Sequence, residues 1–163
     1  ALKDNYDVIH YAGHAEFNPQ HPEGSRLILK HSGGTVLDSL SAGEVNSSIT
    51  GKPLVFLNAC SSAREESIGE ITYVSEADVY GLVSACLLGG ALGVVGALWP
   101  IYDTSAAELA AVFYEHFLAG ERIGDALRLA RQATKSKYAD ISWASFVLYG
   151  DPLMHVSAFS PIG

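Results

Sequence analysis

The central apolar run of the sequence is KPLVFLNAC, residues 52–60. It is introduced by a proline and ends in small residues, a pattern typical of a buried β-strand. A second run, YDVIHYAG at residues 6–13, is rich in β-branched and aromatic residues and ends in a glycine. Two later runs have the same character: ALGVVGALW at 91–99, which Pro100 stops, and WASFVLYGD at 143–151. The sequence therefore predicts four buried strands.

Smaller elements fill the intervals between these strands. The segment SRLILKHSGGTVLDSL, residues 25–40, indicates a hairpin whose turn is Gly33-Gly34. Helices are expected at 41–49 with Ser41 as cap, at 79–88, from Asp103 or Thr104 to a stop at Gly120, and at 123–133. The polar stretch 61–78 is the longest expected loop, and we expect it to be mobile or stabilised by a partner.

Strands that alternate with helices indicate an α/β domain, with a mostly parallel sheet covered by helices on both faces. At 163 residues the chain fits one ordinary domain with a real core. In such a sheet the functional groups are expected where the strands end, at the carboxyl edge.

The chain carries a formal net charge of -8 at pH 7, and 48% of its residues are hydrophobic. It lacks the basic patch that neutralises phosphates, so we expect neither a nucleic acid partner nor an anionic membrane surface. The longest apolar run, at 81–99, contains five glycines and indicates helix, turn and strand rather than a membrane span. With two cysteines and no signal-peptide pattern, we expect a cytoplasmic domain with protein partners.

Two residues with catalytic chemistry stand at the ends of predicted strands, His14 and Cys60. In a parallel sheet both would lie at the same carboxyl edge. A cysteine nucleophile needs an imidazole that holds it as a thiolate, and the imidazolium then protonates the leaving amine. Each residue alone is more often structural, because a buried cysteine usually acts as a small hydrophobe. Cys86, on an apolar helix face, and His10, in mid-strand, are expected to be structural.

A zinc site is the alternative arrangement. His10 and His14 are four positions apart, and Cys60 and His21 could join them. The spacing His-x-x-x-His suits a helix, where both rings lie on one face, whereas Gly13 interrupts a strand here. No Cys-x-x-Cys pair in the sequence supports a metal. We therefore favour the Cys-His pair and expect no metal or other cofactor.

Five segments, taken in order along the chain, resemble the CHAT family of caspase-like cysteine peptidases. They are HYAGHAEF, VFLNACSSA, GALWPIYDTSAAELAAVFYEHFLAG, GDALRLARQA and WASFVLYGDP. The resemblance covers most of the chain, and the order of histidine before cysteine is that of the wider group of caspases, separases and legumains. It implies a six-stranded caspase-like sheet and peptide-bond hydrolysis by Cys60 and His14, with His14 in the family's GHG motif, here GHA.

The resemblance also implies roles for residues near this pair. The backbone N–H groups of Ala15 and Cys60 would form the oxyanion hole, although Ala15 stands where the family has glycine. Asn58 matches a position that lines the pocket for the substrate residue before the scissile bond, or it satisfies local backbone. Trp99 and Asp103 lie on LWPIYD, which is similar to a separase segment that walls this pocket. An acid there favours a basic substrate residue, unless Asp103 serves only as a helix cap.

The histidine strand begins near Tyr6, so the two strands that precede it in the full family domain are expected to be missing. We expect residues 1–163 to be a single caspase-like domain and a C-terminal fragment of a longer chain. Regulation would come from a partner or a sensor module such as a tetratricopeptide repeat domain. The predicted function is that of a cysteine endopeptidase acting on a protein substrate, and the alternative is an inactive caspase-like module that binds a protein in the same cleft.

Overall fold

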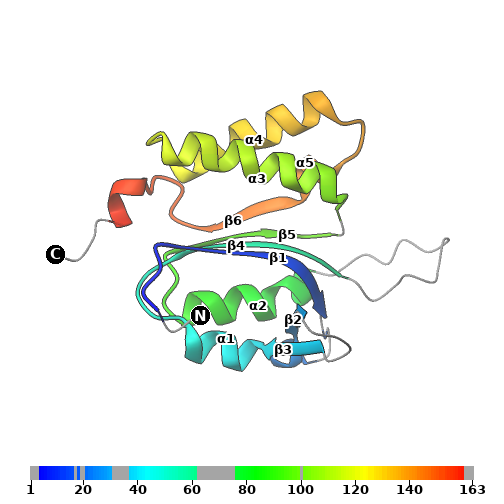
Figure 1. The fold of residues 1–163 in the computed structure, drawn as a ribbon, viewed down its shortest axis with the longest axis vertical. Helices are drawn as coiled ribbons and strands as arrows, with labels where there is room; N and C mark the ends of the chain where they lie inside the picture. The colour runs from blue at the N-terminus through cyan, green and yellow to red at the C-terminus, as the bar shows by residue number, and fades with distance from the viewer. Residues whose placement is uncertain are drawn as a thin grey trace.

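A computed structural model describes residues 4–16, 18, 21–30, 37–61, 76–99 and 101–159 (Figure 1). The elements, in chain order, are β1 (Val8–Glu16), the 3₁₀ turn η1 (Pro22–Gly24), β2 (Arg26–Lys30), β3 (Leu37–Ser41), α1 (Ala42–Ser48), β4 (Leu54–Ser61), α2 (Glu76–Leu88), β5 (Gly93–Ala97), α3 (Asp103–Leu118), α4 (Ile123–Lys137), α5 (Ser142–Ser145), β6 (Phe146–Gly150) and the 3₁₀ turn η2 (Val156–Phe159).

These strands form one mixed sheet in the order β3-β2-β1-β4-β5-β6. Among the described strands, β1–β4 and β4–β5 are parallel, whereas β1–β2, β2–β3 and β5–β6 are antiparallel. The α/β class is confirmed, but the prediction of a mostly parallel sheet is wrong. The connections explain the antiparallel pairs. β2 and β3 form a hairpin, and three helices, α3, α4 and α5, lie between β5 and β6 and return the chain in the opposite direction. The caspase-like character of the sheet and the two missing strands stay predictions.

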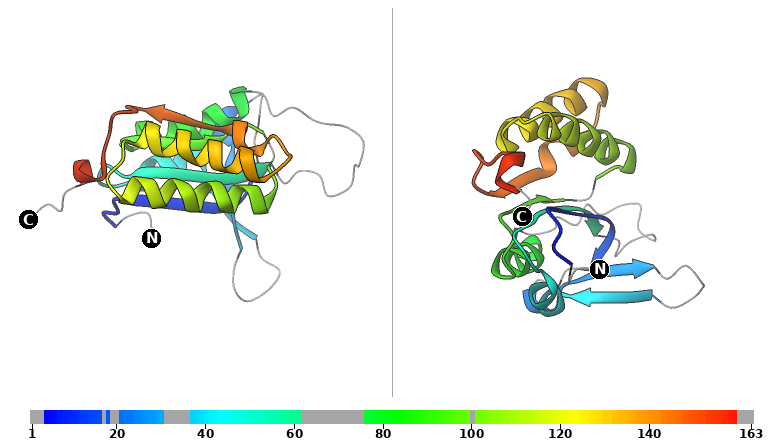
Figure 2. Two further views of the ribbon diagram at one scale, coloured as in Figure 1. Left: turned by 90° about the horizontal axis from the view of Figure 1, so that it is seen from above. Right: turned by 60° about the vertical axis from the view of Figure 1, so that its left-hand side comes forward.

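Helices cover both faces of the sheet, as the sequence predicts. Figures 1 and 2 show α3 and α4 side by side on one face and α1 and α2 on the other. A short turn joins α3 to α4 at Gly120, which has a backbone φ of 100°. The predicted helix stop at Gly120 is confirmed. This backbone conformation is costly for any residue with a Cβ atom, so a glycine is favoured where the helix ends.

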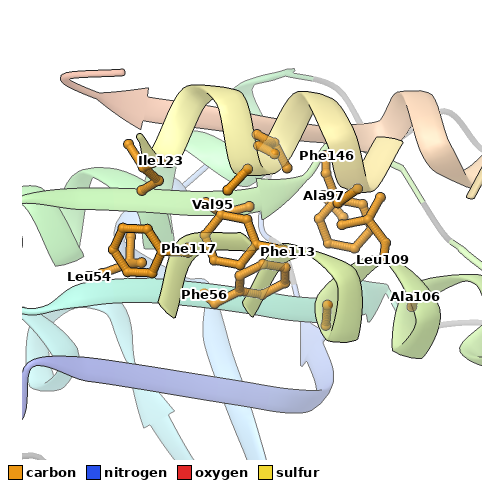
Figure 3. Packing of buried hydrophobic residues seen from close by; sticks show 14 of the residues in the cluster. Leu54, Phe56, Val95, Ala97, Ala106, Leu109, Phe113, Phe117, Ile123 and Phe146 are labelled. Atoms are coloured by element: carbon orange, nitrogen blue, oxygen red, sulfur yellow. The ribbon is translucent and has the colours of Figure 1, made fainter. Parts of the chain in front are cut away.

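The larger core lies between the sheet and the layer of α3 and α4 (Figure 3). Phe56 of β4 lies against Phe113 of α3, with ring centroids 5.2 Å apart, and Phe117 stacks on Phe113 at 5.5 Å. All three side chains are fully buried. Burying one such side chain stabilises the fold by about 1.5–3 kcal/mol, so this cluster fixes α3 on the sheet.

A second core lies under α1 and α2. Val55 and Leu57 point to this side of β4, opposite to Phe56, because side chains alternate along a strand. They belong to one cluster with Leu82 and Val83 of α2. Both faces of β4 are therefore buried, which explains why its sequence is continuously apolar instead of alternating with polar residues.

The helix starts test the predicted caps. Ser41 caps α1 as predicted, with its Oγ accepting from the Glu44 N–H while the Glu44 carboxylate accepts from the Ser41 N–H at 2.8 Å. The prediction that Asp103 or Thr104 caps α3 is wrong, because Tyr102 occupies the N-cap position and its side chain makes no capping hydrogen bond. Asp103 is the first helical residue instead.

Other boundaries shift modestly. α2 begins at Glu76, before the predicted start at residue 79, and α4 continues to Lys137, beyond the predicted end at 133. Two predictions fall on residues outside the described part of the structure. They are the Gly33-Gly34 turn and the mobility or partner binding of the stretch 61–78, of which residues 62–75 are not described.

Candidate active site

The parallel pairing of β1 and β4 brings the two predicted catalytic residues to one place in the backbone. His14 and Cys60 are register partners, near the carboxyl ends of both strands. Figure 1 shows β1 and β4 as neighbours in the sheet. The His14 side chain is exposed. The side chain of Cys60 lies outside the described part of the structure, so the predicted approach of its sulfur to the His14 ring stays a prediction.

Tyr11 holds the backbone at His14 in place. Its hydroxyl donates toward two carbonyl oxygens, that of His14 at 2.6 Å and that of Ile28 in β2 at 2.7 Å. Burial raises the pKa of Tyr11, so the hydroxyl keeps its proton and acts as a donor at neutral pH. The end of β1 is thereby tied to β2 beside the candidate base.

Small residues flank His14 for steric reasons. A Cβ atom on Gly13 would lie 2.7 Å from the Tyr11 hydroxyl oxygen, so only glycine lets the Tyr11 side chain lie across the strand in this way. Ala15 is completely buried, and its register partners are Leu27 of β2 and Ser61 of β4. The amide of Ala15 therefore belongs to a strand that is paired on both sides.

Asn58 lies two residues before Cys60 on β4, with Ala12 as its register partner. It follows Phe56 by two positions, so the alternation of the strand gives it the same face as the α3 and α4 layer. Its side chain is partly buried. This position agrees with either reading of Asn58, as a pocket residue or as a strand-end amide.

Trp99 follows β5 and is held by a buried serine. The Trp99 N–H donates to the Ser145 hydroxyl oxygen at 3.2 Å, and that hydroxyl donates to the Trp99 carbonyl at 3.1 Å. The Leu98 N–H also donates to the Ser145 carbonyl, at 2.9 Å. Ser145 is completely buried, so three short contacts fix the chain just after β5.

Ser142 and Asp140 hold the start of α3 in a similar way. The Tyr102 N–H donates to the Ser142 hydroxyl at 3.3 Å. The Asp140 carboxylate accepts from the Ser105 hydroxyl at 2.6 Å and from the Ser142 N–H at 2.7 Å. Hydrogen bonds from Ser105 and then Ser142 lower the pKa of Asp140, so the carboxylate stays ionised. α5 thus anchors both ends of the segment that carries Trp99 and Asp103.

Tyr11, Ser142 and Ser145 were not predicted from the sequence to support the site. The available signal for the serines was their spacing of three residues in ISWASF, which puts both hydroxyls on one side of a single helical turn before a buried strand. Tyr11 carried no comparable signal, because its acceptors are backbone carbonyls.

Trp99 and Asp103 differ in their surroundings. The indole Nε1 of Trp99 is buried and has no hydrogen-bond acceptor among the described residues, which costs free energy as long as it stays unpaired. Asp103 is exposed at the first position of α3, where the helix dipole favours a negative charge. No described residue pairs with its carboxylate.

Cys86 and His10 have the structural roles that the sequence predicts. Cys86 is 1% exposed, and burial raises the pKa of its thiol to about 12, so it is unreactive at neutral pH. His10 stacks on Phe56 with ring centroids 5.1 Å apart, and its Nδ1 shares a hydrogen bond of 2.9 Å with the Tyr114 hydroxyl. Within the described residues, no three histidine, cysteine or carboxylate side chains are placed to hold a metal ion.

None of the described helices is both long and apolar enough to cross a membrane. A comparison with curated proteins gives no match. A comparison with protein-family models gives the CHAT domain, matched over residues 1–151. This match spans β1, β4 and every other described strand, and it confirms the resemblance carried by the sequence motifs. The chain therefore belongs to the CHAT-domain family, a caspase-like family.

Proposed function

We propose that the protein is a cysteine endopeptidase with Cys60 as nucleophile and His14 as general base and acid. The register pairing of these residues on adjacent parallel strands carries the proposal. Residues paired in this way project toward the same face of a sheet, so an imidazole and a thiol at these positions are expected to be neighbours. Membership of the CHAT family supports the same chemistry.

The proposed reaction has two halves. The Cys60 thiolate attacks the carbonyl carbon of the scissile peptide bond, and a tetrahedral oxyanion forms. The C–N bond then breaks as the His14 imidazolium gives its proton to the leaving amine, which leaves an acyl thioester on Cys60. In the second half, His14 takes a proton from water as the water attacks the thioester, and the carboxylic acid product leaves the thiolate behind.

The oxyanion would be stabilised by the backbone N–H groups of Ala15 and Cys60. Their positions near the carboxyl ends of β1 and β4 support this assignment. The Tyr11 contact supports this assignment as well. The Tyr11 hydroxyl fixes the His14 carbonyl, which belongs to the same planar peptide group as the Ala15 N–H, so the contact sets the orientation of that N–H.

We further propose a pocket that selects a basic residue before the scissile bond, formed by Asn58, Trp99 and Asp103. The helix-cap alternative for Asp103 loses its basis, because Tyr102 is the N-cap residue. An exposed carboxylate without a partner among the described residues is available to pair with a substrate arginine or lysine.

The test of the chemistry is covalent labelling by a peptidyl acyloxymethyl ketone that ends in arginine, with the modified residue located by mass spectrometry. We expect labelling of Cys60 in the wild type and in Cys86→Ala, and none at any position in Cys60→Ala. His14→Ala should reduce the labelling rate by about a hundredfold or more. A wild type that stays unlabelled would favour the alternative, an inactive module that binds a protein in the same cleft.

The test of the pocket is a mixed peptide library cleaved by the wild type and by Asp103→Asn. A preference for arginine and lysine in the wild type that is lost in the variant is the expected result. An unchanged profile in Asp103→Asn would reject Asp103 as the selector and leave the Cys-His pair untouched. We propose a protein as the natural substrate, with regulation by a partner or a sensor module.

A further inference from the structure

A groove of about 510 Å³ runs along the outer edge of the sheet, between β6 and α4. Three of the chain's ten lysines and arginines line it, Arg128, Arg131 and Lys135, although the chain has 18 acidic residues. Trp143 of α5 also lines the groove. A concentration of positive charge in one groove is therefore unusual for this acidic protein and points to an anionic ligand.

The charges of Arg131 and Lys135 are not neutralised by the fold. The Lys135 Nζ lies 4.4 Å from the centroid of the Trp143 ring, and the Arg131 Cζ lies 5.8 Å from it. Such contacts orient a cation without cancelling its charge. No carboxylate among the described residues pairs with either side chain. Arg128 differs, since its Nε lies 3.8 Å from the Asp125 carboxylate, although both of these side chains are about half exposed.

The floor of the groove is an open strand edge. The Leu98 N–H donates to the Ser145 carbonyl at 2.9 Å, which makes the flanking register pair, Ala97 and Phe146, a non-hydrogen-bonded pair. Hydrogen-bonded and non-hydrogen-bonded pairs alternate along an antiparallel ladder. Leu148, two residues after Phe146, is therefore also in a non-hydrogen-bonded pair, and its N–H and C=O groups point away from β5. Leu148 lines the groove, and within the described residues β5 is the sole strand neighbour of β6.

The spacing of the charges suits an extended chain. α4 and β6 run alongside each other (Figure 2). Arg131 and Lys135 are four residues apart on α4, which separates them by about 6 Å along the helix axis. Residues i and i+2 of a strand lie about 7 Å apart and face the same side. Two acidic side chains at i and i+2 of an added strand would therefore meet these two cations together.

We propose that this groove binds an extended acidic peptide segment, which adds to β6 as a further strand and pairs two carboxylates with Arg131 and Lys135. The exposed backbone groups of Leu148 supply the hydrogen bonds, and the two cations supply the preference for acidic side chains. Nucleic acid fits less well, because it has no peptide backbone with which to continue the β-ladder at Leu148. This site is independent of the proposed peptidase chemistry.

The test measures binding of a fluorescein-labelled, acetylated and amidated peptide, Thr-Val-Asp-Val-Glu-Val-Thr, by fluorescence anisotropy. The double variant Arg131→Gln, Lys135→Gln should weaken binding by about tenfold or more. Arg26→Gln, Lys52→Gln is the matched control, because it removes the same charge outside the groove and should change the Kd by less than about twofold. Lys135→Gln alone, at an exposed position, provides the same comparison should the double variant fail to fold.

Two further peptides separate strand addition from simple charge attraction. N-methylation of one set of alternate amides should abolish binding, whereas methylation of the other set should not, because only one set faces β6. Equal tolerance of both would overturn the proposal. Two other results would also overturn it, because the groove would then serve another partner. One is a single-stranded oligonucleotide that binds more tightly than the peptide and is weakened as much by the double variant. The other is a peptide affinity that falls as the protein self-associates in sedimentation experiments.

Discussion

The hydroxyl of Tyr11 donates a hydrogen bond to the backbone carbonyl of His14 at 2.6 Å. The side chain packs in the core under α1 and α2, whereas His14 is exposed at the end of β1. The contact therefore links the position of the candidate base to the core under α1 and α2. It makes Tyr11 a positioning residue in the proposed reaction.

Tyr11→Phe removes this hydroxyl and leaves the ring. We expect a loss of about 0.5–1.5 kcal/mol in the free energy of unfolding, together with slower labelling of Cys60 by the peptidyl inhibitor. Tyr114→Phe is the matched control, since it removes a hydroxyl that bonds to His10 and not to the His14 backbone. Urea unfolding and labelling rates check both effects. An equal decrease of the labelling rate in the two variants would contradict a positioning role for Tyr11.

Ser145→Ala deprives both the N–H and the carbonyl of Trp99 of their partner. Because these groups are part-buried, we expect a loss of about 1–3 kcal/mol in stability. The proposed pocket should also become less selective for arginine over uncharged residues. Ser136→Ala, which removes an exposed hydroxyl bonded to the Gln132 carbonyl, should have neither effect. Cleavage profiles and urea unfolding measure the two outcomes. Unchanged selectivity in Ser145→Ala would show that Ser145 does not shape the pocket.

Two glycine-to-alanine changes should have opposite effects on stability. A Cβ atom on Gly81 in α2 would collide with the backbone carbonyl of Pro22, so Gly81→Ala should destabilise the protein by about 1–3 kcal/mol. A Cβ atom on Gly43 in α1 would meet nothing within 4 Å, so Gly43→Ala should stabilise it by about 0.5–1 kcal/mol through helix propensity. Thermal unfolding compares the pair, and a stabilised Gly81→Ala variant would contradict the close packing of η1 on α2.

His10 should make stability depend on pH. Burial lowers its pKa from the ordinary value of 6.5, so the unfolded chain binds more protons than the folded one between these two pKa values. The contribution of His10 is then fully present above pH 6.5 and is lost as the pH falls through the lower, folded pKa. His10→Phe keeps a ring on Phe56 but cannot titrate. Its unfolding free energy should fall less on acidification than that of the wild type, and parallel profiles would contradict this assignment.

The elements with strong local signals were predictable from sequence. The apolar run ending at Cys60 indicated a strand buried on both faces, and Ser41 with Glu44 fixed the start of α1. Strand direction was not predictable in the same way, because a strand that is buried on both faces has a continuous apolar pattern whether its neighbour runs parallel or antiparallel. The β5–β6 pair shows this, since its direction depends on how α3 and α4 fold back.

Some residues of the candidate site were also predictable from local sequence signals, and others were not. His14 and Cys60 could be identified because each stands at the end of a recognisable strand. The role of Tyr11 could not, because its partners are backbone carbonyls whose positions are set only by the assembled sheet. For Ser145 the spacing from Ser142 was a signal of a shared helix side, but the backbone of Trp99 as its partner was not predictable. Asp103 was misplaced by one position, since the N-cap residue Tyr102 makes no side-chain capping bond and gives no signal in the sequence.

The strands that carry His14 and Cys60 are separated along the chain by β2, β3 and α1, whereas α3 and α4 follow each other directly. Contacts between sequence neighbours close small loops and form early in folding, and pairing of distant parallel strands closes a large loop and forms slowly. A partly folded chain in which only the α3–α4 hairpin has formed therefore does not yet bring the two residues together. On the proposed mechanism, such a chain has no working nucleophile, and the cell is spared peptide-bond cleavage by incompletely folded copies.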